Sequence, residues 1–460
     1  MLDTLGNLER THMCGELRAE NVGEAVVLMG WTAKKRDFGI FTFIDLRDRE
    51  GIIQIVVSEE TATEAHAKAK NLRGEFVIAV KGTVVARTSE TVNKKLPTGE
   101  IEVKADEILI LNDAKVPPFQ LEVAGSENLA SEDLRLKYRY LDLRRPQLQN
   151  NIRMRAKTLA KIREFMEMQD FIEIETPILL KSTPEGARDF IVPSRIHAGK
   201  FFALPQSPQI LKQLCMISGF DKYYQIARCF RDEDLRADRQ PEFSQLDLEM
   251  SFTNQEIIYR LIEGMFRHVF RLIDVELPEK FPRLTYSEAL RRYGSDKPDL
   301  RFEMELQDLS AELRETDFAP FAETLKNGGE IKCVVAKGKA DYSRKQLDDL
   351  QEFAKRYGAN ALAWIKLGDE TTSSLLKVLG QEKIEQLASI ANAEKGDAIL
   401  IVAGRKSVAA ASLGALRLEI AKRENLIPQD VFKPLMVVDF PMFEYNEETG
   451  NYAAAHHPFT

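Results

Sequence analysis

Residues 228–252 carry the sequence RCFRDEDLRADRQPEFSQLDLEMSF, and this stretch decides the fold of the middle of the chain. From residue 245 onward apolar and polar residues alternate, and a period of two predicts a strand with one buried and one polar face. The preceding residues 223–227, YYQIA, predict a partner strand. The two strands together predict a hairpin with an unusually long, charged connecting loop.

The connecting loop is rich in both arginine and acidic residues. Its charged residues are Arg231, Asp232, Glu233, Asp234, Arg236, Asp238 and Arg239. Guanidinium groups bind phosphate oxygens in pairs, and carboxylates accept hydrogen bonds from amines, so the loop is suited to a polyphosphate and an amine. A solvated loop with scattered charges is the alternative. The polar face of the second strand favours a site, because Gln245, Asp247 and Glu249 form an acidic stripe that must line water or a polar ligand.

Three further segments extend this pattern: TPEGARDF at 183–190, LPQSPQILKQ at 204–213 and AAHHPFT at 454–460. Together with residues 228–252 they resemble the class II aminoacyl-tRNA synthetases, in particular the bacterial-type aspartyl branch, over nearly the whole chain. The resemblance implies an ATP- and Mg²⁺-dependent ligase that activates L-aspartate and transfers it to tRNA(Asp). Whether tRNA(Asn) is also a substrate is left open.

Composition sets broad limits. With 460 residues the chain is long enough for about three domains. A net charge of −8 argues against non-specific coating of nucleic acid, so RNA contacts would come from local basic stretches such as 31–49 and 141–165. Four widely spaced cysteines without a CxxC pair argue against disulfides and zinc. With no secretory signal and no membrane-length apolar run, we expect a cytoplasmic protein.

The expected architecture is an α+β multidomain protein. It combines an N-terminal β-barrel of the oligonucleotide-binding (OB) type, an antiparallel class II sheet with flanking helices, and an α/β insertion domain. The expected boundaries are 1–114 for the barrel, 115–135 for a hinge, 136–299 and 426–460 for the catalytic domain, and 300–425 for the insertion.

Five short strands and one helix predict the barrel. The strands are expected at 25–31, 41–46, 52–57, 76–85 and 101–111, and the helix at 62–72. Basic residues precede Phe38, Phe41 and Phe43, a pattern suited to stacking unpaired bases, although at least one of these rings is expected in the core. The resemblance implies anticodon contacts by Arg36, Phe43 and Gln54.

A helix is predicted over 147–170, with an apolar stripe at helical spacing and Pro146 at its first turn. The helix and the strand after it resemble the first class II motif, which implies a homodimer, whereas a simple surface helix is the alternative. The region 300–421 alternates predicted strands and helices. It contains neither a phosphate loop nor a catalytic cluster.

The resemblance also assigns roles to individual residues. Arg231 would bind the α-phosphate and the substrate carboxylate as the catalytic residue, and Asp232, Glu233 and Gln240 would bind ATP. Glu185, Gln209, Lys212, Arg231, Gln245, Asp247, His456 and His457 would contact aspartate. Magnesium ligands are not assigned. The adjacent histidines would point apart on an extended chain, and no further ligand lies at zinc spacing.

Discrimination between aspartate and asparagine needs a charge, because the two side chains are nearly isosteric. Ser207 and Pro208 predict a helix start, with Ser207 as the cap. Gln209 and Lys212 then share one helix face. The resemblance implies that Lys212 faces the substrate carboxylate. A surface lysine is the alternative.

The third class II motif, a glycine-rich strand and a helix with an ATP-binding arginine, has no counterpart before Thr460. We therefore expect this sequence to lack the C-terminal part of the family's catalytic domain. A catalytically inactive tRNA-binding fragment or paralogue is the alternative function.

Overall fold

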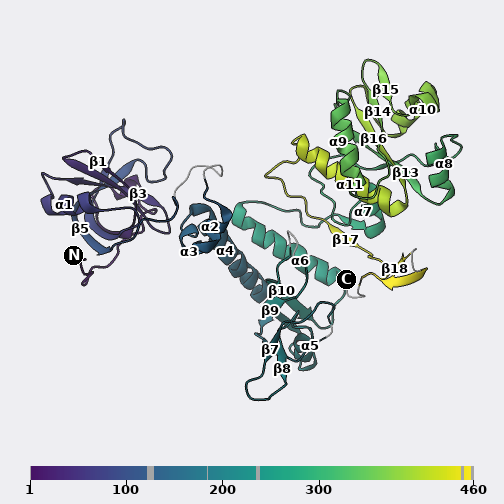
Figure 1. Cartoon of the computed structure of the whole chain (residues 1–460). Helices are drawn as coiled ribbons and strands as arrows, with labels where there is room; N and C mark the ends of the chain where they lie inside the picture. Colours follow the sequence, from purple (N-terminus) through teal and green to yellow (C-terminus); the bar gives the residue numbers. More distant parts are fainter. Residues whose placement is uncertain (1, 122–128, 184, 235–238, 447–449, 457–460) are drawn as a thin grey trace. The chain divides into compact units, whose positions relative to one another are not determined.

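The computed structural model describes residues 2–121, 129–183, 185–234, 239–446 and 450–456 (Figure 1). The chain divides into two compact units, Met1–Ala160 and Lys161–Thr460. Within the described residues, no helix has the length and apolar character needed to cross a membrane.

The first unit contains a closed five-stranded barrel with strand order β1-β2-β3-β5-β4, as the sequence predicted. Parallel pairing of β3 with β5 closes it, and all other pairs are antiparallel. The elements are β1 (Ala25–Asp37), β2 (Phe41–Arg47), β3 (Ile52–Ser58), α1 (Thr63–Asn71), β4 (Val77–Ala86) and β5 (Ile101–Asn112). Inward-facing aliphatic side chains from all five strands fill the interior.

The two faces of β2 differ as alternation predicted. Ile44 and Leu46 are fully buried in the barrel core. Phe38 and Phe41 are 69% and 44% exposed, and Phe43 is half-buried outside the core. The expectation that at least one of these phenylalanines is a core residue is therefore wrong, because the aliphatic residues on the opposite face of β2 already fill the interior.

The barrel contains a buried ion pair between Arg47 and Glu75. One Arg47 Nη lies 2.7 Å from both carboxylate oxygens of Glu75, and both side chains are less than 10% exposed. Arg144 binds the same carboxylate, and its guanidinium lies 4.9 Å from the centre of the Trp31 ring. Two arginines therefore compensate one buried carboxylate.

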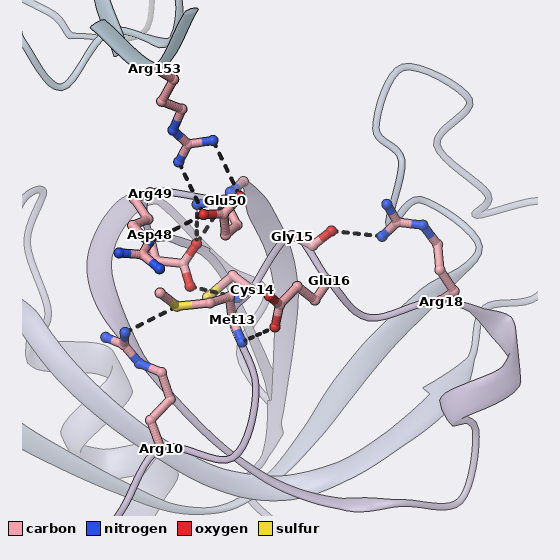
Figure 2. A network of polar contacts seen from close by, with 11 residues as sticks. Arg10, Met13, Cys14, Gly15, Glu16, Arg18, Asp48, Arg49, Glu50 and Arg153 are labelled. Atoms are coloured by element: carbon pink, nitrogen blue, oxygen red, sulfur yellow. Dashed lines mark hydrogen bonds and ion pairs between the residues drawn. The ribbon is translucent and has the colours of Figure 1, made fainter. Parts of the chain in front are cut away.

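A second polar network joins the turn between β2 and β3 to the N-terminal segment (Figure 2). Asp48 accepts hydrogen bonds from the backbone N–H of Cys14 at 2.6 Å and from that of Glu50 at 2.8 Å. The Arg153 guanidinium lies 3.2 Å from the Glu50 carboxylate. Asp48 thus stabilises its own turn. Glu50 links the turn to Arg153, which lies more than 100 residues later in the sequence. The helices of this region are α2 (Glu132–Lys137), α3 (Arg139–Asp142) and α4 (Pro146–Met168).

The helix predicted over 147–170 corresponds to α4, which begins at Pro146 as the proline position indicated. Its C-terminal residues Phe165 and Met166 are buried, whereas Ile152, part of the predicted apolar stripe, is 54% exposed. The role of this face in a dimer stays a prediction.

The second unit contains a three-stranded sheet of order β10-β9-β6. Strands β9 and β10 are antiparallel, and β6 is parallel to β9. The end of α4 and α6 pack on the sheet through Phe165, Met166, Leu261 and Met265. The elements are β6 (Ile172–Glu173), β7 (Ile191–Pro193), β8 (Phe201–Ala203), α5 (Gln209–Ile217), β9 (Lys222–Phe230), β10 (Glu242–Met250) and α6 (Gln255–Phe270).

A five-stranded antiparallel sheet of order β12-β13-β16-β14-β15 follows, covered on both faces (Figure 1). Alternate residues of β13 enter different cores. Val334 packs with residues of α9 and α11, and Cys333 packs with residues of α8 and α10. The elements are β12 (Gln307–Asp308), α8 (Ala319–Lys326), β13 (Glu330–Ala336), α9 (Arg344–Lys355), β14 (Ala363–Leu367), β15 (Thr371–Ser373), α10 (Leu376–Ile390), β16 (Ala398–Gly404) and α11 (Lys406–Arg423).

The strands on either side of this sheet in the sequence pair with each other. β11 (Arg283–Thr285), which leads into α7 (Tyr286–Tyr293), is parallel to β17 (Met436–Val438). β18 (Phe443–Asn446) and β19 (Asn451–Ala454) pair in antiparallel fashion.

We expect Glu75→Gln to lower the free energy of unfolding of the barrel by about 3 kcal/mol, because it removes the buried carboxylate that pairs with both Arg47 and Arg144. The measurement is urea unfolding followed by Trp31 fluorescence in a Trp364→Phe background, which isolates the first unit. Glu352→Gln, which breaks an exposed pair with Lys355, is the control and should cost less than about 1 kcal/mol. Equal effects of the two substitutions would contradict the compensating role of Glu75.

Candidate active site and nucleic-acid interface

One face of the β9–β10 sheet carries the predicted acidic stripe. The register pairs Gln245 with Ala227, Asp247 with Gln225 and Glu249 with Tyr223, so these side chains share one face. Lys212 of α5 reaches the same face. Its Nζ lies 2.8 Å from Asp247 Oδ1 and 3.3 Å from Glu249 Oε2.

Lys212 and Asp247 form an almost fully buried pair, with side chains only 12% and 10% exposed. Asp247 Oδ2 is buried, and no described group donates a hydrogen bond to it. A buried acceptor without a donor is costly, so this oxygen is ready to accept a hydrogen bond from a ligand. Lys212 and Asp247 are both expected from the resemblance to contact aspartate. In the ligand-free chain they pair with each other.

Two buried residues of β9 support this face. Burial, and then the charge of Asp247, raise the pKa of Tyr223, so its hydroxyl stays protonated. That hydroxyl donates to Gln225 Oε1 at 2.9 Å. Burial also raises the pKa of Cys229, to about 11, and its Sγ donates to Gln245 Oε1 at 3.2 Å. The sequence analysis missed both residues, although the alternation of β9 places them on the face of Gln225.

Arg231 leaves the end of β9 with its guanidinium 5.2 Å from the centre of the Phe243 ring. Its neighbours are paired: Arg228 with Glu242 at 3.3 Å, Arg239 with Glu233 at 3.1 Å and Arg188 with Asp232 at 3.6 Å. No described carboxylate forms an ion pair with Arg231. Its guanidinium fork is therefore available to an anionic ligand.

The other residues expected to bind ATP lie near the same loop. Asp232 and Glu233 are both held in the ion pairs with arginine, and Gln240 is exposed. Arg236 and Asp238 lie outside the described residues.

Glu185 is exposed, and both of its oxygens accept hydrogen bonds. Ser207 Oγ donates to Oε2 at 2.7 Å, and Thr183 Oγ1 donates to Oε1 at 3.1 Å. The prediction that Ser207 caps the helix is wrong. Pro208 occupies the cap position of α5 without a side-chain cap, because the Ser207 hydroxyl is engaged by Glu185.

Gln209 is the first residue of α5 and lies one turn before Lys212, as the sequence predicted. The ring of His456 packs against Phe440 and Tyr286, with centroids 4.9 and 6.0 Å apart. Among the described residues, no hydrogen bond, ion pair or ring contact joins His456 to Lys212 or Asp247. His457 lies outside the described part of the chain.

The described residues contain no group of three or more His, Cys, Asp or Glu side chains that could hold a metal ion. They do not form a complete magnesium site by themselves. Magnesium is usually held by one or two carboxylates together with substrate phosphates and water, so it would arrive with a nucleotide.

The barrel has its own polar hollow of about 600 Å³, lined in part by Arg36, Phe43 and Gln54. Arg36 Nη2 donates to Asp45 at 2.7 Å and to Gln54 Oε1 at 3.0 Å. The rings of Phe38 and Phe43 meet edge to face, 5.8 Å apart. Burial raises the pKa of Asp45, and Arg36 opposes this effect. Basic, amide and aromatic groups in one hollow suit an unstacked base.

Comparisons with known proteins match both parts of the chain. The family described as tRNA synthetases class II (D, K and N) matches residues 131–460, and the OB-fold nucleic acid binding domain matches residues 26–111. An aspartate–tRNA(Asp/Asn) ligase of Caldanaerobacter subterraneus is 54% identical over 100% of this chain and 78% of its own length. An aspartate–tRNA ligase of Geobacillus kaustophilus is 53% identical over 98% of this chain and 77% of its own length.

Among solved structures, asparaginyl-tRNA synthetase from Pyrococcus horikoshii, in complex with asparaginyl-adenylate, is similar over 90% of this chain and 96% of its own. The TM-score is 0.52 and the sequence identity 20%. This similarity concerns the fold.

We expect iodoacetamide at pH 8 to alkylate Cys215, which is half-exposed on α5, well before Cys229. With a pKa of about 11, Cys229 is about 0.1% thiolate at that pH, and its Sγ is buried. Mass spectrometry of timed samples measures both rates, and the urea-unfolded chain, in which the rates should converge, is the control. Equal rates in the folded chain would show that Cys229 is not buried beside Gln245 on this sheet face.

Proposed function

Because the chain belongs to the class II tRNA synthetases of the aspartate, lysine and asparagine group, we propose that it is an aspartate–tRNA ligase. It activates L-aspartate with ATP to aspartyl-adenylate and then transfers the aspartyl group to the 3′ end of tRNA(Asp). Highly similar relatives that carry the ligase name favour this function over a catalytically inactive tRNA-binding protein.

The observation that carries the proposal is the position of Lys212 over Asp247 on the polar sheet face. Aspartate carries an ammonium and a side-chain carboxylate, which can replace the internal pair charge for charge. The ammonium takes the place of Lys212 beside Asp247, supported by Gln245. Lys212, assisted by Gln209, then faces the side-chain carboxylate, whereas the neutral amide of asparagine would leave the lysine with only the partly exposed Glu249 as a counter-charge.

The first step needs alignment and no general base. The α-carboxylate of an amino acid has a pKa of about 3.5 and is already ionised at neutral pH. One of its oxygens attacks the α-phosphorus of ATP, and pyrophosphate leaves. Arg231, without a carboxylate partner among the described residues, would hold both the α-phosphate and the attacking carboxylate. In the second step a hydroxyl of the terminal ribose attacks the acyl carbon, and AMP leaves.

The remaining residues complete this assignment. Asp232, Glu233 and Gln240 would contact ATP, and Glu185, His456 and His457 would contact aspartate. The arginine partners of Asp232 and Glu233 support a place near the phosphates, since each pair presents a guanidinium beside its carboxylate. The magnesium that this family typically uses with ATP would be held mainly by the nucleotide.

In the barrel, Arg36, Phe43 and Gln54 would bind the anticodon. The Phe43 ring offers a stacking surface, and Arg36 and Gln54 offer hydrogen bonds in the same hollow. Some relatives are named aspartate–tRNA ligase and others aspartate–tRNA(Asp/Asn) ligase, so charging of tRNA(Asn) is a second proposal for the same site. We further propose that the protein is a cytoplasmic homodimer. Its domains would be residues 1–114, 115–135, 136–299 together with 426–460, and 300–425.

We expect Lys212→Leu to lower kcat/KM for aspartate at least about 100-fold in ATP–pyrophosphate exchange, because it removes a buried counter-charge. The KM for ATP should change less than about threefold. Gln213→Leu, an exposed change on the same helix, is the control. Equal losses for aspartate and ATP would contradict the role of Lys212. Exchange stimulated by asparagine and not by aspartate would overturn the proposed substrate.

We expect Phe43→Ala to weaken tRNA(Asp) binding by about 10- to 100-fold, since stacking of a base on an aromatic ring is worth about 1–3 kcal/mol. Aspartate-dependent exchange without tRNA should not change. Binding curves at several salt concentrations measure the effect, and the salt slope should stay constant because no phosphate contact is lost. Phe41→Ala, on the same strand outside the hollow, should have a smaller effect. Equal effects would place the binding surface elsewhere.

A further inference from the structure

We infer that Gln206 is a positioning residue that fixes the Glu185 loop (its described residues 182, 183 and 185–189) against the start of α5 and so orders the aspartate site before substrate binds. This inference rests on the proposed function in assigning the site to aspartate. The fixing of the loop rests on hydrogen bonds alone.

The side chain of Gln206 is 1% exposed and is bound on both sides of its amide by the Glu185 loop. Its Oε1 accepts from the backbone N–H of Ala187 at 3.2 Å. Its Nε2 donates to the Ala187 carbonyl at 2.9 Å and to Asp189 Oδ1 at 2.5 Å. Both amide hydrogens and one acceptor position are therefore used, so a single residue meets the hydrogen-bonding needs of one loop peptide and one carboxylate.

Neighbouring contacts extend this arrangement. Ser182 Oγ donates to the second oxygen of Asp189 at 2.5 Å, which ties the beginning of the loop to its end. Ser207, the next residue after Gln206, donates to Glu185. Two consecutive side chains therefore bind the loop: Gln206 binds its backbone at Ala187, and Ser207 binds the Glu185 carboxylate.

The same loop contacts the backbone around Arg231. The N–H of Asp232 donates to the Arg188 carbonyl at 3.1 Å, and the N–H of Phe230 donates to the Pro205 carbonyl at 2.9 Å. Residues 187–189, 204–206 and 230–232 thus form one hydrogen-bonded assembly. It joins the segments that carry Glu185, Lys212 and Arg231.

Side-chain bonds matter here because the described residues of the loop form only isolated bridges and no helix or strand. Without a ladder of backbone bonds, the conformational entropy of the loop opposes the placement of Glu185. A residue that fixes the loop in advance lowers the entropy lost on binding, and small displacements of positioning groups reduce rates strongly. An apolar residue of the same size would fill the space without fixing the loop.

Two substitutions and one double substitution test the inference. Gln206→Met keeps the approximate volume and removes all three bonds. Gln206→Glu keeps the acceptor for the Ala187 N–H but sets an oxygen against both the Ala187 carbonyl and the Asp189 carboxylate. Adding Asp189→Asn restores the bond to residue 189 with donor and acceptor reversed, and leaves the Ala187 carbonyl without its donor. Ser412→Ala, which removes the hydrogen bond from the buried Ser412 hydroxyl to the Tyr357 carbonyl, is the control outside the site.

The first readout does not depend on activity. Hydrogen exchange of the ligand-free chain, measured by mass spectrometry, should be at least about tenfold faster for the amides of 185–190 and 232 in Gln206→Met than in the unchanged chain. Ser412→Ala should leave these amides unchanged. Unchanged exchange at 185–190 in Gln206→Met would overturn the inference. If Gln206→Met does not fold, Ser182→Ala loosens the same loop through Asp189 and takes its place in both measurements.

The second readout is ATP–pyrophosphate exchange. The KM for aspartate should rise about 10- to 100-fold in Gln206→Met and Gln206→Glu, with a change below about threefold in the KM for ATP, and the double substitution should recover part of the loss through the restored bond to residue 189. An equal rise in both KM values, or no recovery, would overturn the positioning role. If the unchanged chain shows no aspartate-dependent exchange, the proposed function fails, and the hydrogen-exchange result still decides whether Gln206 fixes the loop.

Discussion

The candidate active site depends on one constraint: a lysine brought into a nearly dry sheet face must have a counter-charge at all times. Lys212 meets this requirement in the ligand-free chain through Asp247 and Glu249. Because removing an ammonium from water costs several kcal/mol, the pair holds α5 against β10 while the site is empty. In the proposed function, the ammonium and the side-chain carboxylate of aspartate would replace this contact without leaving a buried charge alone. Selectivity and stability would then have the same electrostatic origin.

Other residues of the site keep its amide side chains in fixed positions. Tyr223 and Cys229 are buried on the same sheet face and have raised pKa values, so both remain hydrogen-bond donors at neutral pH. Donors that do not titrate give Gln225 and Gln245 constant partners. In the barrel, Arg36 plays a comparable part by binding Gln54 and Asp45 together. Both sites are arranged largely by contacts within the protein.

Periodicity in the sequence was enough to predict the elements that carry these sites. The alternation in β2 and β10 predicted which side chains share a face, and the helical spacing of Gln209 and Lys212 predicted their common position on α5. Partners across the fold could not be predicted in this way. The cap assigned to Ser207 was wrong because its hydroxyl meets Glu185, 22 residues earlier. The importance of Gln206 and Cys229 was missed for the same reason, since a spacing pattern contains no information about long-range contacts. The core role given to one phenylalanine of 38–43 failed because the aliphatic residues on the other face of β2 already fill the barrel.

The pairing of β11 with β17 bears on how this architecture arose. These parallel strands flank the segment that forms the five-stranded sheet, and each sheet face is covered by helices from the same segment. The polypeptide therefore departs and returns at adjacent positions, about 4.8 Å apart, and the intervening part fills both of its hydrophobic layers itself. A segment with these properties behaves as a cassette: ancestral genes could acquire, exchange or lose it while the flanking strands kept their register.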